Sequence, residues 1–301
     1  MKLKGPSSAG VTHVLSIDVE DYFQVEAFAQ SVSRQSWDLY PLRVEENMRA
    51  LLDLLDEHSA VATFFFLGWI AHKLPRLVRE VVGRGHEVAC HSYWHRPIYS
   101  LTPAEFRKDT QDALHAIEAA AGVAVEGYRA PTWSITRESL WALSILQEEG
   151  FLYDSSIYPI RHDLYGIPGA RREPYAWRCT NGFLFEFPPS TLKLGPVTAP
   201  AAGGGYLRIF PLAYTTLAID RTEQAGGRAI VYLHPWELDP RQPRLAGSLK
   251  SRLRHYTGLP GMRSNLTALL KRYQFVPFDR MWRMASVHCN SISLPALPPP
   301  A

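Results

Sequence analysis

The sequence predicts an α/β protein built on a parallel sheet or barrel, and three observations indicate this. Short apolar runs typical of buried strands alternate repeatedly with segments of helical periodicity. Consecutive parallel strands need such crossover helices. Carboxylates, histidines and an arginine recur at the ends of the apolar runs, which is where a barrel enzyme builds its site. The 301 residues are enough for one large α/β domain or two small ones.

The first half of the chain follows the alternation closely. Strands are predicted at residues 13–19, 60–67, 87–90, 125–128 and 151–153, where apolar residues run together. Apolar residues at helical spacing predict helices at 42–58 and 75–83. A capping box at Thr102 with proline at the first helical position predicts a third helix to about residue 121. Thr136 is expected to cap a fourth, which ends at Gly150.

The second half is less regular. Residues 157–178 are rich in Pro, Gly, Arg and His, and they predict a long loop of the kind that is usually functional. Strands are predicted at 183–187, 206–210 and 229–233, with a helix that Pro211 opens. Residues 284–301 are rich in Pro and Ser and are expected to form a disordered tail. One catalytic domain with a C-terminal extension would then span residues 13–283.

Composition and charge exclude several classes of protein. With 46% hydrophobic and 20% charged residues the chain is typical of a globular enzyme, and a net charge of +3 is too small to indicate a nucleic-acid partner. The longest apolar stretch, residues 61–70, is too short for a transmembrane segment. The first eleven residues are not typical of a secretory signal, and the three cysteines form no C-x-x-C pair. A cytoplasmic location is therefore expected.

His91 and His95, in the motif H-S-Y-W-H, are the strongest candidates for metal ligands. Four residues apart, both imidazoles could reach one ion from one face of a helical turn. A hydrolytic metal site needs three protein ligands and an open position for water, and Asp18, Glu20 and Asp21 are the candidates for the third ligand. There is no H-E-x-x-H motif, so the general base is expected from the same acidic cluster at the end of the first strand.

Five motifs, in order, resemble those of the polysaccharide deacetylases, the NodB-homology carbohydrate esterases of family 4. They are S-I-D-V-E-D at residues 16–21, H-S-Y-W-H at 91–95, R-A-P-T-W at 129–133, Y-D-S-S at 153–156 and L-H-P-W at 233–236. The resemblance is strongest to the branch associated with bacterial exopolysaccharide gene clusters of the exosortase and PEP-CTERM type. It implies the NodB homology fold, an irregular (β/α)7-type barrel, here with a C-terminal extension.

The resemblance also implies roles for the motif residues. Asp18 would be the general base, and His234 would be the general acid that protonates the leaving amine. The common family pattern has two adjacent aspartates in the first motif, the second of them a metal ligand, whereas this chain reads D-V-E-D. Glu20 is favoured as the ligand because it points to the same side of a strand as Asp18, and Asp21 is the alternative.

Further residues would support these groups. Arg129 would pair with Asp18 and lower the pKa of that carboxyl. Asp154 would hydrogen-bond the imidazole of His234 and favour its charged form. Aromatic faces suit sugar rings, so a second group of residues is expected to wall the substrate groove: Trp133, Tyr158, Trp177, Tyr206 and Trp236.

The resemblance implies metal-assisted hydrolysis, with zinc as the expected ion. The substrate would be a carbohydrate, an N-acetylhexosamine unit of a bacterial polysaccharide, exopolysaccharide or precursor that loses its acetyl group. Two alternatives remain open. One is a small-molecule amidohydrolase of the allantoinase-like type, which a closed small pocket would favour over an aromatic groove. The other is a non-catalytic carbohydrate-binding relative, which would be expected to lack a metal ligand or the base.

Overall fold

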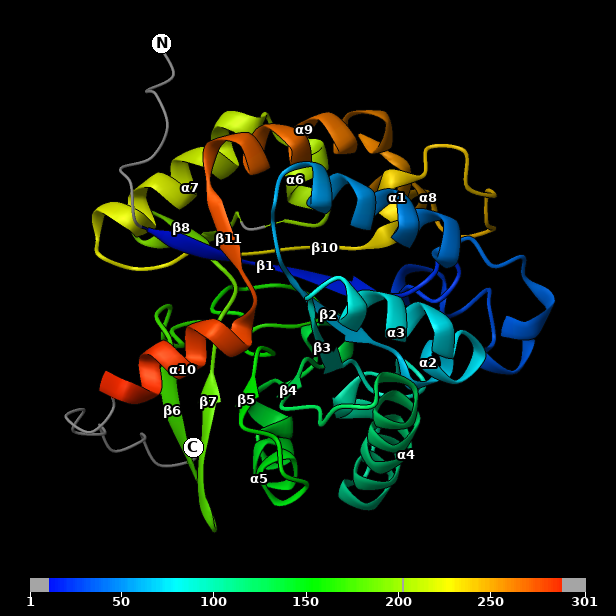
Figure 1. The fold of residues 1–301 in the computed structure, drawn as a ribbon, viewed down its shortest axis with the longest axis horizontal. Coiled ribbons are helices and arrows are strands. Elements are labelled where there is room, and N and C mark those ends of the chain that lie inside the picture. Colours follow the sequence, from blue (N-terminus) through cyan, green and yellow to red (C-terminus); the bar gives the residue numbers. More distant parts are fainter. Residues whose placement is uncertain (1–10, 202, 289–301) are drawn as a thin grey trace.

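The centre of the structure is a nine-stranded sheet in which every strand but one runs parallel to its neighbours (Figure 1). The structure is a computed structural model, and it describes residues 11–201 and 203–288. The parallel strands follow one another in the order β10 (Ile230–Leu233), β1 (Thr12–Val19), β2 (Thr63–Phe66), β3 (Glu87–Cys90), β4 (Gly127–Tyr128), β5 (Tyr153–Asp154) and β7 (Gly182–Glu186). β6 (Tyr175–Cys179) pairs antiparallel with β7 at the outer edge, and β11 (Gln274–Val276) joins β1.

Helices cover the sheet on both sides. In Figure 1, α1 (Val44–Glu57), α6 (Gly205–Ile209), α7 (Leu212–Gln224) and α9 (Leu259–Arg272) lie on one side of β1 and β10. The helices on the other side are α2 (Gly68–Lys73), α3 (Pro75–Gly83), α4 (Pro103–Ala121) and α5 (Trp141–Glu148). The remaining elements are α8 (Leu249–Tyr256), α10 (Phe278–His288) and a hairpin of β8 (Thr191–Leu194) and β9 (Val197–Pro200). No helix in the described part of the chain is long and apolar enough to cross a membrane.

The apolar patterns of the sequence account for the core. Val14, Leu15, Ile17 and Val19 of β1 are all fully buried, as expected for a parallel strand that is covered on both faces. The apolar residues of α1 recur at helical spacing and face the same core. The predicted capping box at Thr102 is present at the start of α4.

The sheet curves into a barrel that closes irregularly between β7 and β10. Ser190, just beyond β7, donates its backbone N–H to the carbonyl of Ile230 at 3.2 Å, and its hydroxyl accepts from the N–H of Ile230 at 2.7 Å. Gly203 pairs with Tyr232 of β10. A Cβ at Gly203 would lie 1.8 Å from the carbonyl oxygen of Tyr232, so only glycine fits this approach. The predicted α/β fold with a mostly parallel sheet is confirmed.

Several local predictions are wrong. Residues 206–209 belong to α6 rather than to a strand, because so short a run of mostly apolar residues does not distinguish helix from strand by periodicity. The predicted loop at 157–178 ends early, since β6 begins at Tyr175. Residues 91–95 form no helical turn; Ser92 and His95 have φ of 66° and 51°. α10 continues to His288, beyond the expected start of the tail at 284, and residues 289–301 lie outside the described residues.

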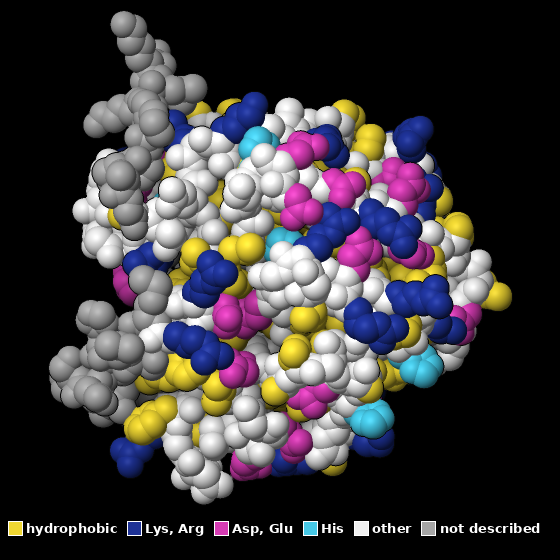
Figure 2. Space-filling model, in the orientation of Figure 1, with side chains coloured by type: hydrophobic (Ala, Val, Ile, Leu, Met, Phe, Trp, Pro, Cys, Tyr) yellow, Lys and Arg dark blue, Asp and Glu magenta, His cyan; other side chains and the backbone are white. Residues whose placement is uncertain are grey.

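Charges of both signs are interspersed over the face that Figure 2 shows, and no single-sign patch dominates it. Several charged side chains of the protein pair with one another, as in the cluster of Arg84 with Asp53, Asp56 and Glu80. Such mixed surfaces are typical of globular proteins that do not bind nucleic acid through a basic footprint.

Candidate active site

The carboxyl ends of the parallel strands surround a small pocket of about 170 Å³. This is the edge at which an α/β barrel places its functional side chains. The residues that line it are Asp18, Glu20, Val25, Glu26, His91, His95, Ala130, Thr132, Trp133, Tyr232, His234 and Trp236. The structure thus brings together most of the residues that the five motifs predict.

Strained backbone marks the loops around this pocket. Among the described residues, the non-glycine residues with positive φ are Ser59, Ser92, His95, Thr132 and Trp133. All but Ser59 belong to the two loops that carry the paired histidines and Trp133. Such conformations cost free energy and tend to occur where the surrounding structure holds a functional side chain in place.

Asp18 is fixed by a buried arginine, as the sequence predicts. Its Oδ1 accepts a hydrogen bond from Nη1 of Arg129 at 2.6 Å, and the Arg129 side chain is fully buried. Arg129 also donates to the hydroxyls of Ser16 at 2.9 Å and Ser155 at 3.0 Å. The second oxygen, Oδ2, lies 3.9 Å from Nε2 of His234. One carboxylate oxygen is therefore held by arginine while the other faces an imidazole across the pocket.

The two motif histidines lie against each other, with ring centroids 5.3 Å apart. Nδ1 of His91 lies 2.7 Å from the carbonyl oxygen of Arg129, which only accepts, so Nδ1 carries the proton and Nε2 of the neutral ring does not. Nε2 of His95 lies 3.1 Å from Oε2 of Glu20. A histidine that binds a metal through one ring nitrogen usually donates the N–H of the other to an acceptor. The Arg129 carbonyl is such an acceptor for Nδ1 of His91.

The donor chemistry of this cluster fits a divalent cation. Burial lowers the pKa of His91 to about 4 and places the pKa of His95 well below its usual value, so both rings are neutral at neutral pH. Burial raises the pKa of Glu20 to about 7, although the attraction of the nearby His234 acts to lower it. Within residues 11–201 and 203–288, no three donor side chains meet the spacing of a metal site as they stand, so binding requires side-chain adjustment here.

Asp21, the alternative ligand, is placed elsewhere. Its Oδ2 accepts from the backbone N–H groups of Arg43 at 2.7 Å and Val44 at 2.9 Å, and its Oδ1 accepts from the N–H of Tyr22. The carboxylate therefore satisfies the free N–H groups at the start of α1. Asp21 thus caps α1 and does not line the pocket, whereas Asp18 and Glu20, the other two acids of this motif, do.

Asp154 does not orient His234, which corrects one prediction. Its oxygens accept from the hydroxyl of Ser156 at 2.5 Å and from the N–H of the same residue at 3.2 Å. It faces the buried carboxyl of Glu186, and burial raises the pKa of Asp154 to about 6. Asp154 therefore holds the loop after β5, and its place beside His234 is taken by another acid.

That acid is Glu237, whose Oε2 lies 3.2 Å from Nδ1 of His234. Its other oxygen pairs with Nε of Arg208 at 2.5 Å. Burial acts to lower the pKa of His234, but the carboxylates of Glu20, Glu237 and Asp18 outweigh it and raise that pKa to about 9. The sequence analysis missed Glu237, although its position three residues after the histidine was a usable signal.

The aromatic predictions divide into two groups. Trp133 and Trp236 line the pocket, and Tyr232, which the sequence analysis missed, lines it beside them. Tyr158 is fully buried behind Trp133, at a centroid distance of 5.2 Å. Tyr206 and Trp177 do not line this pocket. Tyr206 lies on α6 and stacks on Phe210, and Trp177 on β6 packs against the core.

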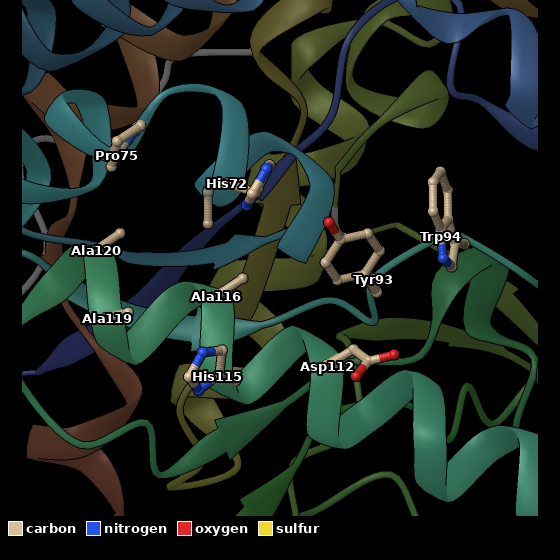
Figure 3. Close-up of a pocket in the computed structure, with 10 residues that line it drawn as sticks. His72, Pro75, Tyr93, Trp94, Asp112, His115, Ala116, Ala119 and Ala120 are labelled. Carbon is tan, nitrogen blue, oxygen red and sulfur yellow. The ribbon is translucent and has the colours of Figure 1, made fainter.

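A second hollow lies between helices on the flank of the barrel (Figure 3). This flank groove has a volume of about 510 Å³, and α2, α3 and α4 form its sides. Tyr93 and Trp94, the two residues between Ser92 and His95, stand at one end of it. Its other lining residues are Ala71, His72, Pro75, Asp112, His115, Ala116, Ala119 and Ala120.

Comparisons with known proteins agree with this geometry. A chitooligosaccharide deacetylase of Bradyrhizobium sp. (strain ANU 289) is 33% identical over 94 residues, which are 31% of this chain and 43% of the relative. A peptidoglycan-N-acetylglucosamine deacetylase of Bacillus cereus is 32% identical over 93 residues, 31% of this chain and 34% of the relative. The matched part is thus less than half of either relative.

The fold comparison extends over the whole chain. A crystal structure assigned as a polysaccharide deacetylase from Mycobacterium smegmatis superimposes with a TM-score of 0.65 at 19% identity. It covers 100% of this chain and 99% of that one, which shows a shared fold.

Two families match along the sequence. Residues 29–149 match the polysaccharide deacetylase family, and residues 155–283 match a domain of unknown function, DUF3473. Strands from both segments belong to the same sheet, and Asp18 lies ahead of both matches. One part of the chain thus matches the polysaccharide deacetylase family and another matches DUF3473, and the two parts share one sheet.

Proposed function

We propose that this protein is a metal-dependent hydrolase that removes N-acetyl groups from N-acetylhexosamine units of a bacterial polysaccharide, exopolysaccharide or precursor. The observation that carries the proposal is the placement of Asp18. One of its carboxylate oxygens is held by Arg129, and the other lies 3.9 Å from Nε2 of His234. A carboxylate and an imidazole so placed can serve as base and acid on the two sides of one amide. The exopolysaccharide setting rests on the motif resemblance alone.

The metal would be held by His91, His95 and Glu20, and zinc is the ion that two imidazoles and a carboxylate suit best. A bound zinc ion would polarise the acetyl carbonyl and lower the pKa of a water molecule toward about 7. The protein supplies two neutral imidazoles and a buried carboxylate for it. It also supplies a site that is largely closed to bulk solvent, since all three side chains are nearly fully buried.

The proton transfers would be divided between two residues. Asp18, oriented by Arg129, accepts the proton of the attacking water. His234 donates its proton to the nitrogen of the leaving amino sugar, and its raised pKa of about 9 keeps it protonated at neutral pH. Trp133, Tyr232 and Trp236 would contact the sugar ring through their faces. The products would be acetate and a free amino sugar.

The size of the pocket supports a second candidate function. A cavity of about 170 Å³ holds a small ligand, and a small cyclic amide of the allantoin type fits that description as well as a single sugar does. The aromatic wall of Trp133, Tyr232 and Trp236 favours the sugar. A non-catalytic relative is disfavoured, because the base, the acid and the expected ligands all line the pocket.

The test is acetate release over a panel of N-acetylated oligosaccharides, with allantoin and hydantoin as parallel arms. We expect zinc-dependent acetate release from at least one acetamido sugar and none after chelation. Ring opening of a cyclic amide without acetate release would establish the second candidate instead. Oligosaccharide binding without turnover in the zinc-loaded protein would establish the non-catalytic reading. The predicted cytoplasmic location, in which a precursor would be the substrate, is checked separately by cell fractionation.

A further inference from the structure

A buried chain of polar groups stands behind His234, and it comes entirely from the DUF3473 segment. Nδ1 of His234 contacts Oε2 of Glu237 at 3.2 Å, and Oε1 of Glu237 contacts Nε of Arg208 at 2.5 Å. The side chain of Glu237 is 0% exposed and that of Arg208 is 2% exposed. Ion pairs this deeply buried are costly unless every donor and acceptor is satisfied, so the rest of their contacts matter.

Besides its bond to Glu237, Arg208 donates three hydrogen bonds to carbonyls at the C-terminal end of α8. Its Nη1 donates to the carbonyls of His255 at 2.9 Å and Thr257 at 2.6 Å, and its Nη2 donates to the carbonyl of Arg254 at 3.2 Å. The guanidinium also lies over the ring of Trp236 at 5.2 Å. The C-terminal helices thus fix the arginine, and the arginine holds Glu237 as a paired carboxylate.

Glu237 is fixed to the histidine at two points. Besides the contact with Nδ1, its Oε2 accepts the backbone N–H of His234 at 2.9 Å, which caps the single helical turn over Pro235–Leu238. On the pocket side, Nε2 of the same ring lies 3.2 Å from Glu20 and 3.9 Å from Asp18. The ring therefore has carboxylates on both sides. The contact of Nδ1 with Glu237 leaves Nε2 as the nitrogen that faces the pocket.

We infer that Glu237, held by Arg208, is the positioning residue for the general acid, and that the DUF3473 segment thereby supplies the acid half of the active site. A carboxylate that accepts from Nδ1–H fixes both the tautomer and the orientation of an imidazole. Nε2 is then directed at the pocket. Glu237 acts through His234 and touches no reacting atom. The inference rests on the proposed function in one respect, that His234 is the proton donor.

The first test is Glu237→Gln, which keeps the shape of the side chain and an oxygen for the backbone cap. We expect the kcat for an acetamido sugar to fall by about tenfold to a hundredfold, with KM changed by less than about twofold. An activated aryl acetate needs no protonation of its leaving group, so its turnover should fall by less than about threefold. Glu237→Asp should recover part of the loss, since it restores the charge.

Asp239→Asn is the matched control. Asp239 lies two residues further on, has a side chain only 4% exposed and pairs with Arg43 at 2.5 Å, but in the described part of the chain no hydrogen bond or ion pair joins it to His234. The Asp239→Asn substitution therefore removes the ion pair with Arg43 and leaves the contacts of the His234 imidazole in place. We expect it to lower the melting temperature while leaving the ratio of acetamide to aryl acetate turnover at the wild-type value.

Arg208→Lys tests whether Arg208 acts on His234 through Glu237. If arginine acts only through Glu237, the losses in acetamide turnover of Arg208→Lys and Glu237→Gln should not add in the double variant. Additive losses in the double variant would overturn the inference. An equal fall in the turnover of the acetamido sugar and of the aryl acetate in Glu237→Gln would overturn it as well, because general destabilisation has that effect.

One measurement is independent of turnover. In wild-type protein the Nδ1–H of His234 should give a downfield proton signal that Glu237→Gln removes and Asp239→Asn keeps, with His234→Gln assigning it. If wild type released no acetate from any sugar but showed this signal, the proposed function would fail while the contact stood. Absence of the signal in wild type would overturn the inference whatever the activity.

Discussion

The active-site pocket and the flank groove are hollows of opposite character. The flank groove is the larger, at about 510 Å³ against about 170 Å³. Its floor is a row of alanines on α4, and its histidines, His72 and His115, are exposed to solvent. The polar side chains of the pocket are buried instead; Asp18 is 3% exposed and His91 is 2% exposed.

The difference shows that desolvated polar groups, and not volume, mark the site. Buried polar groups cost free energy unless they are paired, so a cluster of them persists where it is used. The pocket holds Glu20 with a pKa raised to about 7 and His234 with one raised to about 9. Perturbed groups that meet in one cleft make that cleft a candidate for the catalytic site.

The largest expected effect comes from the paired histidines. His91→Ala or His95→Ala should reduce both zinc content and acetate release to background without unfolding the protein, because each removes one of three proposed ligands. Metal content by mass spectrometry, beside a melting curve, measures this. Full zinc occupancy in both variants would reject the proposed metal site. The metal would then no longer distinguish the pocket from the flank groove as a candidate active site.

The next effect concerns the base. Asp18→Asn should keep the metal and lower turnover by about a hundredfold to ten-thousandfold, because an amide accepts no proton from water. Zinc content and acetate release are measured on the same preparation. A variant that turns over normally would contradict the assignment of Asp18.

A third prediction separates the two neighbouring acids. Glu20→Gln should weaken zinc affinity by at least about tenfold, whereas Asp21→Asn should leave zinc affinity unchanged and lower the free energy of unfolding by about 1 kcal/mol, since it weakens a helix cap. Zinc titration and denaturant unfolding distinguish the two. If Asp21→Asn empties the site, the ligand assignment is wrong.

The smallest effect is expected in the flank groove. Ala119→Arg places a long charged side chain in the groove, and Ala104→Arg places the same side chain at an exposed position of the same helix. Both variants should turn over a short acetamido sugar within about twofold of wild type. A selective loss in Ala119→Arg, measured as kcat/KM, would give the groove a role in catalysis and break the comparison.

Much of the fold could be predicted because its strands are buried on both faces. Residues 13–19 and 87–90 read as apolar runs for this reason, and they form β1 and β3. The segment 206–210 could not be assigned, because a short run with an inward arginine satisfies either period. The motif loop at 91–95 was misjudged because its left-handed residues depend on tertiary contacts, such as the bond that Nη2 of Arg34 donates to the carbonyl of His95 at 2.8 Å.

In the site, as in the fold, local sequence pattern predicted some features, and tertiary packing decided the others. Asp18, Glu20, His91 and His234 line the pocket as predicted, because the end of an apolar run fixes where its side chain emerges. The partner of His234 was assigned to Asp154 by motif position, yet the ring meets Glu237, three residues along its own turn. Which of two buried acids an imidazole faces is decided by packing, and Arg208 on a distant helix takes part in that packing.

The position of β1 has a consequence for how the chain folds. β1 precedes its neighbours in the chain, and one of its edges pairs with β2 at a short sequence separation, through the register of Ser16 with Thr63. Its other edge waits for β10, where Val14 pairs with Ile230. Contacts of such sequence separation close large loops and slow folding. Until residue 233 has left the ribosome, one edge of an apolar central strand stays unpaired, so the nascent chain should depend on holdase chaperones more than its finished surface suggests.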